Sequence, residues 1–207
     1  MNLSRPYAAI CPTLDSDVLN VLARTSRPLT GREVSRLVGR SSHGGVREVL
    51  NRLTREGIVD REEAGRAFMY TLNREHLAAP AVVVLAGMKS ELARRLRHAV
   101  ENWILSPTAA LMFGSAARGD GDTASDIDIL IIRPKGVDDE DGIWRRQLGD
   151  LSRSVSRWTG NRASIAEVAE KELARLLEEN APIVSDLQQD SVPFYGTETL
   201  AMIGVGP

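Results

Sequence analysis

The sequence predicts an α+β protein built from two modules that a long helix joins. Three runs of apolar residues at helical spacing fall within residues 14–56, and a pattern suited to a hairpin follows at residues 58–72. Further along, the apolar run 109–113 and the β-branched run 126–132 each predict a strand. Runs of helices and runs of strands therefore occupy separate parts of the chain, which predicts the α+β class.

We expect an N-terminal domain at residues 1–78, a linker helix at residues 79–103 and a C-terminal α/β domain with a mixed sheet at residues 104–207. The charge pattern supports this division. Residues 1–101 hold 16 basic and 11 acidic residues, whereas residues 102–207 hold 10 and 17. A basic half joined to an acidic half indicates modules with different partners.

Three helices are expected in the N-terminal domain. The first begins at Asp15 or Asp17, whose side chains suit a helix cap. The second begins at a capping box of Thr30 and Glu33, in which each side chain satisfies an unpaired backbone N–H of the other residue. The third covers residues 42–56 and presents basic, hydrogen-bonding side chains on the face opposite its apolar stripe.

The helices and the hairpin together resemble a winged helix-turn-helix domain over residues 14–76. The phrases Gly57-Ile58-Val59 and Tyr70-Thr71-Leu72-Asn73 are typical of such domains. The resemblance implies that the third helix enters the major groove of double-stranded DNA while the hairpin contacts the backbone.

This resemblance assigns the DNA contacts to one asparagine and four arginines. They are Arg47, Asn51 and Arg52 on the third helix, and Arg61 and Arg66 on the hairpin. Eleven arginines against six acidic residues between positions 24 and 74 favour DNA binding electrostatically. The alternative is a domain used for dimerisation or for packing on its neighbour, with solvated arginines.

Residues 81–103 predict one long helix, because apolar side chains recur every three or four residues and form a narrow stripe. The stripe comprises Leu85, Met88, Leu92, Leu96, Ala99 and Trp103. The helix either lies against its own domains or forms the seam of a homodimer. We favour the homodimer, because many winged helix-turn-helix regulators bind DNA as pairs.

The stretch most indicative of chemistry covers residues 114–130 and joins the two strands expected in the C-terminal domain. Asp126 and Asp128 alternate along the second strand, so their side chains project from one face, roughly 7 Å apart at Cα. Two carboxylates at this spacing repel each other unless a cation lies between them. Because Mg²⁺ and Mn²⁺ take oxygen ligands of this kind, the alternation predicts a divalent metal site.

Ahead of the aspartates, the sequence predicts contacts to phosphate. Gly114-Ser115 ends the first strand at a tight turn, where glycine lets backbone N–H groups approach an anion. The residues after it can open a helix whose N-terminus favours phosphate. Arg118 either neutralises phosphate charge or pairs with the acidic loop that follows.

These residues resemble the signature of the DNA polymerase β-like nucleotidyltransferase superfamily, and most closely its small, minimal members. The resemblance rests on Gly114-Ser115, Ala117-Arg118-Gly119 and Ser125-Asp126-Ile127-Asp128, and it covers residues 107–196. It implies that a nucleoside monophosphate moves from a nucleoside triphosphate to an acceptor hydroxyl, with release of pyrophosphate. In the two-metal scheme that it implies, the two aspartates hold the ions.

The resemblance also implies a third carboxylate on a neighbouring strand. Glu167, in the alternating segment 162–169, is expected to complete the metal site or to act as general base. Many relatives carry aspartate at this position, and Glu170 lies close by. The alternative is a winged-helix transcriptional regulator whose nucleotidyltransferase-like domain only senses nucleotide or serves as an antitoxin-like partner protein. A missing third carboxylate would favour this alternative.

The composition bounds the compartment. Cys11 is the single cysteine, which excludes an intramolecular disulfide and favours a reducing compartment. No basic stretch followed by a long apolar run opens the sequence, and the most apolar stretch, residues 78–88, contains Pro80 and is too short to span a bilayer. We therefore expect a cytoplasmic protein without a membrane partner.

Overall fold

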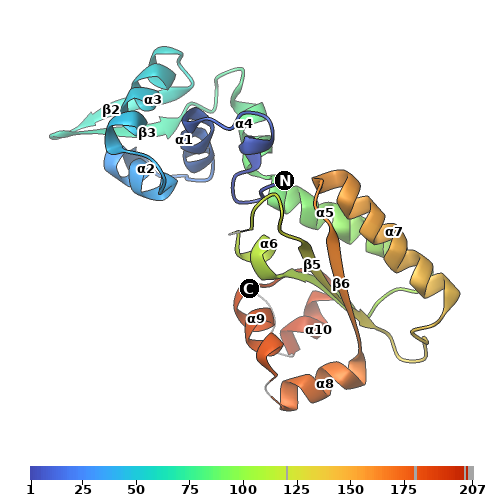
Figure 1. Ribbon diagram of the computed structural model, residues 1–207. Coiled ribbons are helices and arrows are strands. Elements are labelled where there is room, and N and C mark those ends of the chain that lie inside the picture. The colour runs from blue at the N-terminus through green and yellow to red at the C-terminus, as the bar shows by residue number, and fades with distance from the viewer. Residues whose placement is uncertain (120, 180, 203, 205–207) are drawn as a thin grey trace. The chain divides into compact units, whose positions relative to one another are not determined.

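The protein forms two compact units in the computed structural model (Figure 1). The N-terminal unit is Arg5–Met88, and the C-terminal unit combines Met1–Ser4 with Lys89–Pro207. The residues expected to form a linker helix are thus divided between the two units. The structure describes residues 1–119, 121–179, 181–202 and 204.

The N-terminal unit contains the three helices and the hairpin that the sequence predicts. The helices are α1 (Leu14–Ala23), α2 (Gly31–Val38) and α3 (His43–Arg55), and the hairpin strands are β2 (Val59–Ala64) and β3 (Ala67–Leu72). Three further elements are η1 (Pro6–Ala9), β1 (Leu29–Thr30) and α4 (Ala79–Ala86). The sheet is antiparallel in the order β1-β3-β2, and apolar side chains from α1, α2, α3 and β3 form one core.

The capping box at the start of α2 is confirmed. The backbone N–H of Glu33 donates to Thr30 Oγ1 at 3.2 Å, and the backbone N–H of Thr30 donates to Glu33 Oε2 at 2.7 Å. The hydrogen bond from the Thr30 backbone is the largest of the causes that lower the pKa of Glu33 to about 2.

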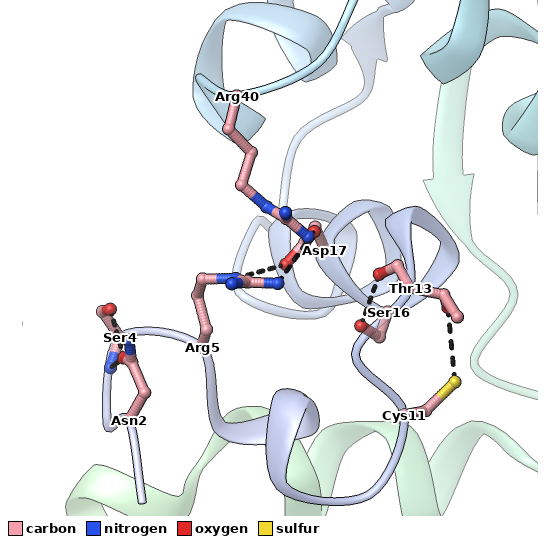
Figure 2. Close-up of polar contacts among 8 residues, drawn as sticks. All are labelled: Asn2, Ser4, Arg5, Cys11, Thr13, Ser16, Asp17 and Arg40. Atoms are coloured by element: carbon pink, nitrogen blue, oxygen red, sulfur yellow. Dashed lines mark hydrogen bonds and ion pairs between the residues drawn. The ribbon is translucent and has the colours of Figure 1, made fainter. Parts of the chain in front are cut away.

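The expected cap of α1 at Asp15 or Asp17 is wrong, because the helix begins at Leu14 and its cap position is Thr13. Both aspartates instead bind arginines. Asp15 pairs with Arg52, and Asp17, only 8% exposed, lies between Arg5 and Arg40 (Figure 2). These ion pairs link α1 to the segment before it, to the loop after α2 and to α3.

The single long helix expected over residues 81–103 is also wrong. Gly87 ends α4, and α5 (Met88–Glu101) begins at the next residue. Glycine is a poor helix former, and here its N–H bonds back to the carbonyls of Val83 and Val84.

The break divides the predicted apolar stripe between two cores. Leu85 packs on the core of the N-terminal unit, whereas Leu92 and Leu96 are buried in the core of the C-terminal unit. Leu92 and Leu96 are covered by their own chain and are not free to form a homodimer seam. Homodimerisation itself stays a prediction.

The C-terminal unit is a sheet with helices on both faces. Its strands are β4 (Ala109–Phe113), β5 (Ile127–Arg133), β6 (Ala163–Ala169) and β7 (Val192–Tyr195). Besides α5, its helices are α6 (Gly114–Arg118), α7 (Gly142–Thr159), α8 (Glu170–Glu178), α9 (Pro182–Asp190) and α10 (Thr197–Met202). None of the helices in the described part of the chain is long and apolar enough to cross a bilayer.

The strand order in this unit is β6-β5-β4-β7, with β5 and β6 parallel and the other pairs antiparallel, so the predicted mixed sheet is confirmed. One face packs on α5 and α7 through a core that includes Ile129 and Trp144. The other face packs on α8, α9 and α10 through residues such as Leu130 and Leu200 (Figure 1). Because β4 and β5 are antiparallel neighbours, the end of β4 and the start of β5 meet at one end of the sheet.

Candidate functional site

The candidate site is centred on Asp128, at the start of β5. Its strand neighbours are Phe113 on β4 and Ser164 on β6. Burial raises the pKa of the Asp128 carboxyl, and the negative charge of Asp126 raises it further. A hydrogen bond with Ser164 and the charge of Arg118 act in the opposite direction. The two predicted aspartates are therefore close enough to repel each other electrostatically.

Gly114 closes one side of the site. It follows β4 directly, adopts a φ of +68° and begins the short helix α6. A Cβ atom at this position would lie 2.5 Å from Oδ2 of Asp128. Any side chain would therefore displace the Asp128 carboxylate, and the close approach requires glycine.

Ser115 lies beneath the loop that connects α6 to β5. Its carbonyl accepts hydrogen bonds from the backbone N–H groups of Gly119 at 2.9 Å and Gly121 at 3.2 Å. A Cβ on Gly121 would lie 2.9 Å from Ser115 Oγ, so the loop passes close to the hydroxyl. Ser115, Asp122 and Asp126 line one small cavity at this point.

Asp122 holds the same loop in place through hydrogen bonds of its carboxylate. Its Oδ1 accepts from the backbone N–H groups of Ala124 and Ser125 at 2.8 and 2.9 Å, and from the Ser125 hydroxyl at 2.9 Å. These bonds form a tight turn immediately before Asp126.

Glu167 is not part of this arrangement. It pairs with Ile131 along β5, three residues beyond the Ser164–Asp128 pair, and adjacent residues of a strand face opposite sides of the sheet. Its carboxylate instead forms an ion pair with Arg133 at 2.5 Å. Over the described residues, no group of three acidic, histidine or cysteine side chains is placed to hold a metal. The prediction that Glu167 completes the metal site is therefore wrong.

Sequence reasoning missed Asn161, which lies in the turn between α7 and β6. Its side chain is almost fully buried and donates hydrogen bonds to the carbonyls of Asp122 and Ser125. A single asparagine after a helix-ending glycine predicts only a turn, so no sequence signal pointed to this role.

The part of the chain that forms this site matches a known protein family. Residues 90–188 match the family of nucleotidyltransferase domains. The matched range, just under half of the chain, includes Gly114, both aspartates and Asn161. It supports the nucleotidyltransferase part of the resemblance and does not extend to the N-terminal unit. No curated protein and no solved structure gives a significant match.

The predicted DNA-binding residues lie in the N-terminal unit, outside the range that matches the family, and they differ in their contacts. Arg47 and Arg66 line a groove of about 430 Å³ between α3 and β3, together with Arg32, His43 and Phe68. We call this the basic groove. Neither Arg32, Arg47 nor Arg66 forms a side-chain hydrogen bond or ion pair with any residue that the structure describes.

Three other predicted DNA-binding residues lie outside the basic groove. Arg52 on α3 is bound to Asp15, with Nε 3.0 Å from the carboxylate. The Arg61 guanidinium lies 4.5 Å from the centroid of the Phe68 ring, an arrangement that stabilises the hairpin by a cation–π interaction. Asn51 is exposed on α3. Arg47 and Arg66 therefore line one groove, whereas Arg52 lies outside it and is bound to Asp15.

Proposed function

We propose that the nucleotidyltransferase domain moves a nucleoside monophosphate from a nucleoside triphosphate to an acceptor hydroxyl and releases pyrophosphate. The observation that carries this proposal is the contact between Gly114 and Asp128, beside a second carboxylate at Asp126. A half-buried strand end that keeps one glycine against one of two carboxylates at alternate positions suits a bound cation and phosphate.

The donor set fits Mg²⁺ or Mn²⁺. Both ions take hard oxygen ligands, and Mg²⁺ is often held by one or two carboxylates together with substrate phosphates. When bound, such an ion would neutralise charge that develops on the phosphate oxygens. Since Ser164 occupies the strand position beside Asp128, the protein offers two carboxylates here. A second ion of a two-metal reaction would therefore depend on the triphosphate for more of its ligands.

The other residues of the site bind and orient the triphosphate in this proposal. Gly114 and Ser115 contact the β- and γ-phosphates through backbone N–H groups and the Ser115 hydroxyl. Arg118 is exposed, and its charge already acts on Asp128, which places it within electrostatic reach of the same phosphates. Its role is to offset their negative charge, which stabilises the transition state when that charge increases during transfer.

The alternative function is nucleotide sensing without transfer. Ser164 favours it, because a hydroxyl beside Asp128 supplies neither a third metal ligand of comparable strength nor a general base. In this alternative the same residues bind a metal–nucleotide complex, and the bound state is read by a partner protein or by the N-terminal unit.

The test is a transfer assay with each labelled triphosphate, Mg²⁺ or Mn²⁺, and a pool of small-molecule, protein and RNA acceptors. We expect the wild type to transfer label and the Asp126→Asn/Asp128→Asn variant to lose transfer by several orders of magnitude. Asp150→Asn is the matched control, because it removes an exposed carboxylate on α7 and is expected to keep full activity. Metal-dependent binding of nucleotide without transfer to any acceptor would instead support the sensor.

We also propose that the N-terminal unit binds double-stranded DNA. Its support is the basic groove, where Arg32, Arg47 and Arg66 have no hydrogen-bond or ion-pair partner among the described residues. Arg40 and Arg52, by contrast, are neutralised by acidic residues of α1. Asn51 and Arg61 would contact DNA beside the groove. Arg52 would contribute only after exchanging Asp15 for a phosphate.

DNA binding is tested by the salt dependence of duplex affinity, measured by fluorescence anisotropy. Arg47→Ala and Arg66→Ala are each expected to lower the slope of log affinity against log salt by about one. Arg157→Ala, an equal loss of charge on α7, is expected to leave the slope unchanged. Affinity that does not depend on salt would contradict the proposal and favour a packing or dimerisation role.

A further inference from the structure

Asn161 makes more polar contacts with its surroundings than a turn residue requires. Only 4% of its surface is exposed. Its Nδ2 group donates to the Ser125 carbonyl at 2.8 Å and to the Asp122 carbonyl at 3.3 Å, and its Oδ1 accepts from the amino group of Met1. Its own backbone N–H donates to Thr159 Oγ1 at 3.1 Å. Every polar group of the side chain is therefore satisfied, as burial demands.

Arg162, the residue after Asn161, binds the residue that follows Asp126. The backbone N–H of Ile127 donates to the Arg162 carbonyl at 2.8 Å. Thus Ser125 and Ile127, the two neighbours of Asp126, are bound by the consecutive residues Asn161 and Arg162. Asp126 itself precedes β5, so the ladder of strand hydrogen bonds does not fix it. Its backbone position depends on this turn.

The chemistry of the amide explains why the turn holds an asparagine. Two carbonyl oxygens point at one side chain, and asparagine is the residue of this length that offers two N–H donors from one atom. An aspartate of the same shape offers only acceptors when ionised, so it would repel both carbonyls. An alanine would remove the donor of both carbonyls.

We propose that Asn161 is the positioning residue for Asp126, setting its place relative to Asp128 so that both carboxylates bind one metal–nucleotide complex. This inference rests on the proposed function of the site. Asn161 acts through the loop carbonyls of Asp122 and Ser125, to which its side chain donates.

The proposal is tested by Mn²⁺ binding to the full chain without nucleotide, measured by electron paramagnetic resonance. Asn161→Asp and Asn161→Ala are expected to weaken Mn²⁺ binding about 10- to 100-fold, the usual effect of losing a residue that orients metal ligands. In the transfer assay, both variants are expected to raise the KM for the metal–nucleotide complex and to lower kcat.

Two control variants separate positioning from general stability. Thr159→Val changes a residue beside the same turn and removes the acceptor of the Asn161 backbone N–H. The Thr159 hydroxyl itself donates to the Val155 carbonyl and not to the Asp122–Ser125 loop. The variant is expected to lower the melting temperature while Mn²⁺ affinity stays at the wild-type value. Asn102→Asp makes the same chemical change at an exposed site, where it removes a hydrogen bond to the His98 carbonyl at the end of α5. It is expected to lower the melting temperature slightly and to leave Mn²⁺ affinity at the wild-type value.

The outcomes distinguish this inference from the proposed function. If wild-type protein binds Mn²⁺ and both Asn161 variants bind it equally tightly, the positioning role is overturned and the site assignment stands. If Thr159→Val weakens binding as much as the Asn161 variants, the effect is general destabilisation and the inference is again overturned. If the wild type binds neither Mn²⁺ nor metal–nucleotide complex, the proposed function itself fails.

Discussion

Gly114 and Asp128 are in contact at the end of the sheet, with space for a hydrogen atom on the glycine and for nothing larger. A Cβ at residue 114 would lie 2.5 Å from the Asp128 carboxylate oxygen, and the glycine φ of +68° is itself unfavourable for other residues. Two independent requirements, one for space and one for backbone conformation, therefore act on the same position.

Gly114→Ala is expected to abolish binding of the metal–nucleotide complex, because the new methyl group displaces the Asp128 carboxylate. Gly136→Ala is the matched control, since Gly136 also has a positive φ, of +90°, while no described atom lies within 4 Å of its added Cβ. The control isolates the backbone strain, about 1–3 kcal/mol for a side chain in this conformation. Chemical denaturation and nucleotide titration measure both effects. Equal losses in the two variants would show that space beside Asp128 is not the reason for glycine.

The raised pKa of the Asp128 carboxyl predicts that the free energy of unfolding falls as pH rises. Its pKa is raised in the folded protein, first by burial and then by the charge of Asp126, so the folded state binds the proton more tightly than the unfolded state. The stabilisation is complete below the ordinary aspartate value near 3.8 and is lost as pH rises through the folded pKa. Asp128→Asn carries no charge at this position and is expected to remove that part of the pH dependence.

At neutral pH and without divalent ions, Asp128→Asn should therefore melt at a higher temperature than the wild type. Added Mn²⁺ should raise the melting temperature of the wild type and leave the variant unchanged, because only the wild type keeps both carboxylates. A variant that is less stable than the wild type at pH 7 in metal-free buffer would argue against the repulsion between Asp126 and Asp128.

The parts of the site that the sequence predicted are those fixed by local geometry. Alternation along one strand brings Asp126 and Asp128 to one face, and a strand-ending Gly114 allows a close approach, whatever the rest of the fold does. The prediction for Glu167 was wrong because the face of the sheet on which its side chain lies depends on the register between β5 and β6. A shift of one residue reverses every side chain of a strand, and no local pattern fixes that register.

The remaining differences also come from tertiary contacts. The apolar residues over 81–103 have helical spacing throughout, but the helix is interrupted at Gly87. Leu85, before the interruption, and Leu92, after it, pack in different cores. The role of Asn161 depends on the carbonyls of Asp122 and Ser125, which lie far from it in the sequence and beside it only in the fold. Periodicity predicts which residues are buried in these segments, and it does not predict what they are buried against.

Glu167 and Arg133 are expected to stabilise the fold without taking part in binding. Both side chains are about one-fifth exposed and form an ion pair on β6 and β5. Glu167→Gln leaves the Arg133 charge without its carboxylate, which is expected to cost about 1–3 kcal/mol of unfolding free energy. Mn²⁺ affinity and transfer rate should stay at wild-type values when measured well below the melting temperature.

A loss of Mn²⁺ binding in Glu167→Gln, at unchanged stability, would show that Glu167 takes part in metal binding after all. The reciprocal variant Arg133→Met removes the cation and keeps an apolar side chain of similar length, so it is expected to destabilise by leaving the Glu167 carboxylate unpaired. A double variant should be less destabilised than the sum of the two single variants, because removing both charges leaves neither one unpaired.

Glu33 gives the N-terminal unit a stability that is lost in acid. Hydrogen bonds from the Thr30 backbone and hydroxyl and from Arg27 lower the Glu33 pKa to about 2, below its ordinary value of 4.5. The folded state therefore releases this proton more readily than the unfolded state. Its contribution is complete above about pH 4.5 and is lost as pH falls through about 2.

Glu33→Gln keeps the shape of the capping box and removes the charge. The stability difference between the wild type and this variant is expected to be largest at neutral pH and to shrink steadily between about pH 4.5 and pH 2, as followed by urea denaturation monitored by circular dichroism. Glu62→Gln on β2 is the control, because this exposed carboxylate forms no hydrogen bond or ion pair within the described residues. A difference between wild type and Glu33→Gln that stayed constant over this range would mean that the hydrogen bonds of the box, and not its charge, provide the stabilisation.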